Sequence, residues 1–241
     1  MSYNIMNKAI LNVAGISVFA AMFCMGCYDL GLEPTVKPSA VETFKDSRDG
    51  HVYKKVKIGT QTWMAENLRF AADGSVCYDD YWAAYDSAKN CEVYGRLYDW
   101  YTAMDGESGS SAEPSGVKGV CPADWHLPSY AEWTTLIDYV GEHSGTKLKS
   151  HEFHDYSELH TPDGADMYNF SALPGGIGWH RDGSNHFGRI GNDGYWWTAT
   201  ELDSDSEKIW VNMLDDTHTT VIRYNIDKHG YFLSVRCVHD Y

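Results

Sequence analysis

Apolar and polar residues alternate over positions 52–58 (VYKKVKI), and a second short apolar segment follows at 61–64 (QTWM). Gly59 and Thr60 separate the two segments. Strict alternation is typical of a half-buried strand, and a two-residue connection that contains glycine is typical of a hairpin turn. The pattern therefore predicts a β-hairpin over residues 52–64.

The spacing of apolar residues then changes from two residues to three or four. Residues 82–100 lead into a predicted helix. Apolar side chains recur there at i, i+3, i+4 and i+7, namely Leu97, Trp100, Tyr101 and Met104. Residues with this spacing lie on one face of an α-helix. We therefore predict a first helix that carries these four side chains on a shared face.

A second helix has the clearest local signal in the chain. Ser129 and Glu132 form a capping box, in which the serine oxygen accepts a first-turn amide and the glutamate reaches back to the backbone. One apolar face follows, made of Trp133, Leu136, Ile137 and Val140. Gly141 is predicted to end the helix.

Beyond this helix the pattern favours short extended segments separated by glycine-rich turns. The predicted strands are residues 169–174, 194–200, 208–213, 219–224 and 231–238. The sequence has no internal repeat and no second change of composition, so we expect one domain over residues 41–241. Two early helices followed by antiparallel strands predict the α+β class.

The start of the chain has the pattern of a secretion signal. Lys8 precedes an apolar stretch at 9–23, which has the length of a signal's apolar region and is short for a membrane span of about 20 residues. Gly26-Cys27 follows and is similar to the lipobox of bacterial lipoproteins. We expect residues 1–27 to be a signal peptide with Cys27 lipidated. Simple cleavage and a retained anchor helix are the alternatives.

Residues 28–40 contain two prolines and little periodicity, so they are expected to form a tether between the anchor and the domain.

Four cysteines remain in the domain, at Cys77, Cys91, Cys121 and Cys237. An even number in an exported domain implies two disulfides, with three possible pairings. The favoured pairing joins Cys77 to Cys91 and Cys121 to Cys237, worth about 3 and about 4.7 kcal/mol in the chain-entropy model. No two of these cysteines have CxxC spacing, which argues against a thiol nucleophile or a metal thiolate.

The amino-acid composition limits the classes of ligand that the protein is expected to bind. The net charge of −15 argues against nucleic acid, because a phosphate backbone attracts lysine and arginine. Nine Trp and seventeen Tyr leave two interpretations, since such rings either line a ligand surface or fill an irregular core. We assign four tryptophans to the core: Trp125, Trp133, Trp196 and Trp210.

A polar, glycine-flanked segment at residues 178–183 is the candidate ligand-binding loop. It contains Trp179, His180, Arg181 and Asp182. An exposed tryptophan could stack on the apolar face of a sugar ring while the arginine and aspartate bind its hydroxyls. The alternative is that Trp179 packs the loop against the core.

No pattern predicts catalysis or a resident cofactor, so the protein is expected not to be an enzyme. His151 and His154 are three residues apart, whereas a zinc-binding HExxH motif needs four, and no G-x-S-x-G occurs. Calcium is the one metal with a candidate site. Asp203, Asp205 and Glu207 alternate as oxygen ligands do in a calcium loop, although a solvated acidic turn explains them equally well.

Several motifs together resemble a known family. They are residues 94–100 (YGRLYDW), 121–129 (CPADWHLPS), 169–176 (NFSALPGG), 195–201 (YWWTATE) and 233–238 (LSVRCV). Over residues 41–240 the chain is similar to the Fibrobacter succinogenes major paralogous domain family. The resemblance implies a C-type-lectin-like fold, related to formylglycine-generating enzymes, with two helices, small irregular antiparallel sheets and long loops. It also implies the Cys121–Cys237 bridge.

Members of this family tend to be secreted or lipid-anchored, and the resemblance implies no activity. We therefore expect a lipid-anchored binding module of the cell envelope, at the outer membrane or cell surface. Its expected partner is a polysaccharide or another envelope component. The alternatives are a structural or protein-interaction domain and a formylglycine-generating-type enzyme, for which no spare thiol remains.

Overall fold

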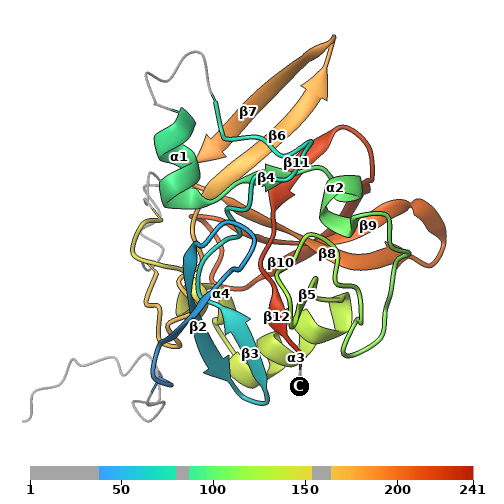
Figure 1. Ribbon diagram of the computed structural model, residues 1–241. Coiled ribbons are helices and arrows are strands. Elements are labelled where there is room, and N and C mark those ends of the chain that lie inside the picture. The colour runs from blue at the N-terminus through green and yellow to red at the C-terminus, as the bar shows by residue number, and fades with distance from the viewer. Residues whose placement is uncertain (1–37, 80–86, 154–163, 241) are drawn as a thin grey trace, which may run out of the picture. The chain divides into compact units, whose positions relative to one another are not determined.

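The computed structural model describes residues 38–79, 87–153 and 164–240 (Figure 1). Of these residues, 36% lie in strands and 16% in helices, and the strands form two sheets of five and seven strands. The predicted α+β, C-type-lectin-like class with two helices and small sheets is therefore wrong. Hairpins of consecutive strands supply most of the pairing, and the last two strands, Tyr231–Ser234 and Val238–His239, join these hairpins to partners that are far away in the sequence, which builds large sheets that local patterns do not reveal.

The first sheet has the strand order β1-β2-β3-β12-β5. Its strands are β1 (Glu42–Lys45), β2 (Val52–Ile58), β3 (Gln61–Met64), β5 (Trp125–His126) and β12 (Val238–His239). The predicted hairpin at residues 52–64 is confirmed, because Ile58 pairs with Gln61 across the Gly59-Thr60 turn. The last strand inserts between β3 and β5, so the end of the chain is held in the middle of this sheet.

The second sheet contains the longest strands. They are β4 (Leu97–Tyr98), β6 (Gly175–Arg181), β7 (Ser184–Ile190), β8 (Gly194–Leu202), β9 (Asp205–Leu214), β10 (Ile222–Asp227) and β11 (Tyr231–Ser234). The main strand order is β10-β9-β8-β11-β6-β7, and β4 pairs with β11. The β6–β7 hairpin extends away from the other strands (Figure 1).

Most of the late strands agree with their sequence pattern. The predictions at 194–200 and 208–213 are confirmed by β8 and β9, whereas the predicted strand at 219–224 begins only at Ile222. Residues 169–174 are not a strand, and only Ala172 makes a bridge there, with Lys149. Asn169 and Ser171 have positive φ angles of 55° and 50°, which interrupt an extended backbone.

The helices are α1 (Ser87–Tyr94), α2 (Trp100–Met104), α3 (Tyr130–Val140) and α4 (Ser144–Leu148). The first predicted helical face is wrong in part, because Leu97 lies in β4. Asp99 starts α2 by accepting the amide of Thr102, so the helix cannot include the residues before it. The capping box of Ser129 and Glu132 at α3 is confirmed, and Gly141 ends that helix as predicted.

Aromatic side chains fill much of the core. The Trp63 ring lies 4.9 Å from that of Trp133, whose ring lies 6.1 Å from that of Trp196. The core assignment is confirmed for Trp125, Trp133 and Trp196, which are at most 2% exposed. Trp210 is only half-buried, because it packs its ring against Tyr130 near the surface.

A fully buried arginine joins distant parts of this core. The guanidinium of Arg236 donates to Asn67 Oδ1 at 2.9 and 3.2 Å and to the carbonyl oxygens of Phe170 and Ser171. It also lies over the Phe170 ring, 4.4 Å from the centroid. Burial lowers the pKa of Arg236 to about 9, and this effect outweighs the charges of Asp166 and Glu66, which raise the pKa.

Both favoured disulfides are confirmed. Cys77 and Cys91 are 14 residues apart, and Cys121 and Cys237 are 116 apart. The first pair is half-buried, and Arg96 Nη1 lies 3.4 and 3.6 Å from its two sulfurs, whereas the second pair is completely buried. No helix in the described part of the chain has the length and apolar character to cross a membrane.

The two disulfides should therefore differ in reactivity. Reductant must reach the sulfur, and a neighbouring guanidinium stabilises the thiolate that reduction releases. In the native protein under mild dithiothreitol, Cys77 and Cys91 are expected to become alkylated well before Cys121 and Cys237. Alkylation with iodoacetamide followed by peptide mass spectrometry measures the order. Simultaneous modification of all four cysteines would contradict this expectation.

Candidate functional site

A surface groove of about 380 Å³ is lined by residues of α2, of the β10–β11 connection and β11, and by His180 near the tip of the β6–β7 hairpin. Its wall comes from three stretches of chain that are distant in sequence. The lining residues are Asp99, Tyr101, Thr102, His180, Lys228, His229, Gly230 and Phe232. The groove thus combines aromatic rings with charged and hydroxyl groups, a composition typical of sites for polar organic ligands.

The short helix α2 places an aromatic ring on the surface. Trp100 turns inward, is 4% exposed, and donates its indole N–H to the carbonyl of Thr198 at 3.3 Å. Its neighbour Tyr101 faces outward and is 48% exposed. Successive residues of a helix point in directions about 100° apart, so burying one of the two rings leaves the other at the rim of the groove.

Polar contacts hold this rim in place. Tyr101 Oη lies 3.2 Å from His229 Nε2, and their ring centroids are 5.3 Å apart. Lys228 Nζ forms an ion pair with Glu201 at 2.7 Å and lies 4.7 Å from the centroid of the Trp100 ring. His229 in the β10–β11 connection therefore restrains the tyrosine ring. Because the free side chain already has few rotamers, ligand binding costs less conformational entropy.

The opposite wall of the groove is one face of the hairpin. His180 N–H donates to the Gly230 carbonyl at 2.7 Å, which ties β6 to the start of β11. The His180 ring is exposed, and its Nδ1 lies 2.9 Å from Asn185 Oδ1 on β7. The imidazole is thus oriented by its neighbour and leaves its second nitrogen for a ligand.

The predicted ligand-binding loop at residues 178–183 is a β-hairpin instead. Asp182 and Gly183 form its two-residue turn, with φ angles of 52° and 78°. Side chains alternate between the faces of a strand, so Trp179 and His180 point in opposite directions. Trp179 is half-buried and stacks on His186 at 5.9 Å, while Arg181 is exposed at the tip.

Of the four predicted residues, only His180 lines the groove. Arg181 and Asp182 pair with each other at 3.5 Å and are 76% and 86% exposed, so they lie at the hairpin tip. The four residues therefore do not line one groove together, and ligand binding by them stays a prediction. A loop would have allowed all four side chains to converge, whereas the pleat of a strand separates them.

The candidate calcium ligands lie in the β8–β9 hairpin. Asp203 lies in its turn, Asp205 and Glu207 lie on β9, and all three are exposed. Among the described residues, no group of three or more His, Cys, Asp or Glu side chains could hold a metal ion. Calcium binding stays a prediction, and the described residues do not bring a set of calcium ligands together.

Other predicted positions fall outside the groove. His151 is exposed, and His154 lies outside the described residues. Cys27, with the signal peptide at 1–27, also lies outside them, as does the tether up to residue 37; residues 38–40 are exposed and have no regular secondary structure.

Most residues of the groove are not predicted from the sequence. The apolar pattern places Tyr101 on a shared helical face with Trp100, and the capping role of Asp99 is the local signal that shows where this helix begins. His229 and Phe232 carry no local signal, because they reach the groove only through strand pairing.

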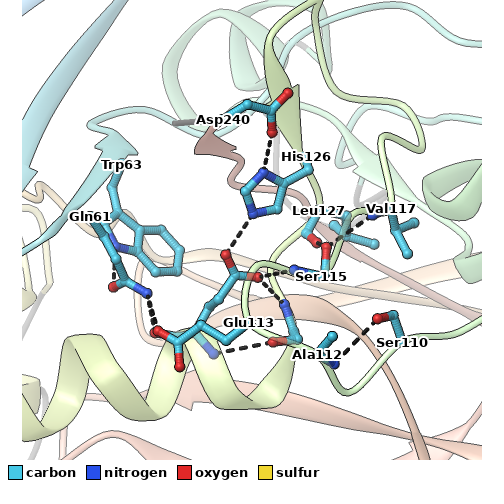
Figure 2. A network of polar contacts seen from close by, with 12 residues as sticks. Gln61, Trp63, Ser110, Ala112, Glu113, Ser115, Val117, His126, Leu127 and Asp240 are labelled. Carbon is cyan, nitrogen blue, oxygen red and sulfur yellow. Dashed lines mark hydrogen bonds and ion pairs between the residues drawn. The ribbon is translucent and has the colours of Figure 1, made fainter.

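A second polar cluster lies elsewhere, with His126 and Glu132 buried and Asp240 at the surface (Figure 2). His126 Nδ1 lies 2.5 Å from Asp240 Oδ1, and its Nε2 lies 2.6 Å from Glu132 Oε1. The other oxygen of Glu132 accepts the backbone amides of Ser129 and Ser115 at 2.9 and 3.1 Å. This cluster joins α3, β5 and the end of the chain, so its role is structural.

Burial disfavours the charged form of His126, but the hydrogen bonds and charges of Glu132 and Asp240 outweigh it and raise the histidine's pKa.

The fold and the groove define a disulfide-bonded, predominantly β domain with an aromatic and polar surface site. A family model, the Fibrobacter succinogenes major domain, matches residues 56–239, and the chain belongs to this family. No curated protein and no solved structure matches it. The family resemblance carried by the sequence motifs is thereby confirmed.

The His126 cluster predicts how stability depends on pH. A pKa raised above the unfolded value of about 6.5 stabilises the fold fully below that pH, and this contribution is lost as the pH rises through the folded-state pKa. We expect the free energy of unfolding to fall on this alkaline side, and to fall less in His126→Gln. Urea titrations from pH 5.5 to 9 measure both slopes. Equal slopes would show that His126 does not control this range.

Proposed function

We propose that this protein is an exported, lipid-anchored binding module of the cell envelope whose groove at Tyr101 binds neutral polysaccharide. The observation that carries the proposal is an exposed aromatic ring fixed beside polar groups. Tyr101 is held by His229, and Asp99, Thr102 and His180 line the same groove. A sugar ring has apolar faces and a polar edge, and this arrangement offers a partner to each.

The chemistry of the groove favours binding over reaction. The Asp99 carboxylate already accepts the amide of Thr102 at 2.8 Å and its hydroxyl at 3.2 Å, and Lys228 is paired with Glu201. These groups are committed to holding the walls in place. A pre-organised groove loses little conformational entropy on binding, which is an advantage for a module that acts by recognition.

Charge supports a neutral ligand. The chain carries a net charge of −15, so an acidic polysaccharide would be repelled before it reached the groove. His180 and His229 each offer donors and acceptors in their neutral form, which suits hydroxyl groups. We therefore propose neutral glycans, such as cellulose-like and xylan-like chains, as the class to test.

Export and anchoring rest on the N-terminal sequence and on the disulfides. Residues 9–23 have the length and apolar character of a signal, and Gly26-Cys27 ends it. Two disulfides form and persist in an oxidising compartment, which agrees with passage out of the cytoplasm. A groove that recognises polysaccharide would then be displayed on the envelope by the acyl chains of Cys27.

Replacing Tyr101 tests the proposed ligand class. The full chain in mild detergent is expected to be retained by cellulose, xylan or another neutral glycan on an array. Tyr101→Ala should bind about tenfold or more weakly, because it removes the ring that would be covered by the sugar.

Tyr139→Ala is the matched control, since Tyr139 is an exposed tyrosine on α3, at 57%, outside the groove. Melting curves show that both variants fold. Retention on no glycan by the folded protein would overturn the proposal, and so would equal loss in the two variants.

The lipid anchor has its own test. In a bacterial host, the full chain is expected to incorporate labelled palmitate and to sediment with membranes, whereas Cys27→Ala should lose the label and appear in the soluble fraction. Cys24→Ala serves as the matched control, because it removes a neighbouring cysteine and leaves Cys27. Label that persists in Cys27→Ala would contradict lipidation at this residue.

A further inference from the structure

A second groove of about 390 Å³ lies along the outer strand of the same hairpin. It is lined by Val76, Cys77, Asp79, Asn185 and Phe187. Its hairpin residues, Asn185 and Phe187, belong to β7, whereas the first groove takes His180 from β6 and Phe232 from β11. Each groove is near the lower end of the volume range for small-ligand sites, about 300–1,000 Å³. Either groove alone would therefore hold only a short segment of a polysaccharide.

The register of three strands shows that the two grooves share one surface. Gly178 of β6 pairs with Phe232 of β11 and with Phe187 of β7. Paired residues of neighbouring antiparallel strands carry their side chains on the same face of the sheet. Two phenylalanine rings therefore flank a glycine on one face, with one ring lining each groove.

Gly178 keeps this surface open. A Cβ atom at this position would lie 3.0 Å from Phe187 Cε1 and 3.1 Å from Phe232 Cβ. Both distances are shorter than ordinary van der Waals contact, so a larger residue would push the two rings apart. Glycine thus allows the aromatic row Phe232-Gly178-Phe187 to form an unbroken strip across the strands.

A polar row runs beside the aromatic one. His180 lies two residues beyond Gly178 on β6, pairs with Asn185 of β7, and donates its amide to Gly230 next to β11. His180 lines the first groove and Asn185 the second, and their side chains meet at 2.9 Å. Adjacent strands are about 4.8 Å apart, so the two rows extend roughly 10 Å from β11 to β7.

We infer that the two grooves are neighbouring subsites of one extended site, which takes an unbranched neutral polysaccharide lying across β11, β6 and β7. This inference rests on the proposed function of the first groove. The sugar rings stack on the aromatic row while their hydroxyls meet the polar row of His180 and Asn185. Tyr101 covers the chain at one end, and Asp79 faces it at the other.

The position of the site on the sheet favours a polysaccharide over a peptide. An extended peptide is usually captured at a sheet edge, where unpaired backbone groups bind it. The two rows lie instead on the face of the sheet, where β6 is paired with both β11 and β7. Recognition there must come from side chains, and alternating rings and polar groups match the repeating faces and hydroxyls of a glycan.

The test is the dependence of affinity on chain length. Calorimetry of the full chain with cello- and xylo-oligosaccharides of two to six sugars should show that affinity rises about tenfold or more from the shortest to the longest ligand that binds. Phe187→Leu and Asp79→Ala, which change residues of the second groove alone, should remove most of this gain and leave the binding of the shortest ligand unchanged.

Ser184→Ala is the matched control, because Ser184 is exposed on β7 and faces the opposite side of the hairpin. It should keep the full gain with length. Binding without a gain, or a gain that both groove variants retain, would overturn the extended site while leaving the first groove as a ligand site. Failure of every oligosaccharide and of the parent polysaccharides to bind would overturn the proposed function itself.

Discussion

The burial of Arg236 is the constraint on which the rest of the structure depends. A guanidinium without water costs several kcal/mol unless its donors are all accepted in place. Here the acceptors are neutral oxygens of Asn67, Phe170 and Ser171, supplied by segments that are far apart in the sequence. All of these acceptors surround the guanidinium only when the segments are packed together. Burial of the charge therefore requires each segment to be in its native position.

Arg236 also stands at the junction of the two sheets. β11 ends at Ser234 and pairs with β4, β6 and β8, whereas β12 begins at Val238 between β3 and β5. Cys237, next to the arginine, is bonded to Cys121 and is completely buried. A few residues near the end of the chain therefore connect both sheets, and β11 beside them pairs with β6 of the hairpin that carries the proposed site.

Contacts within the fold also hold the walls of the two surface grooves. These walls come from α2, from the face of β6, β7 and β11, and from the segment beside the half-buried disulfide of Cys77. Each wall is held by contacts beneath it, such as the indole hydrogen bond of Trp100 and the backbone bond from His180 to Gly230. The position of the aromatic rings is thus set by the fold rather than by a ligand.

The sequence by itself determined the local features and the family. The hairpin at 52–64, the capping box at Ser129, both disulfides and three core tryptophans follow from short-range patterns or from cysteine pairing. Only the tertiary structure decided the mostly β class, because its sheets join strands separated by most of the chain, such as β3 and β12. It also decided the site. A GWHRDG segment reads equally well as a loop or a strand, and only pairing with β7 and β11 sent His180 toward Tyr101 and Trp179 away from it.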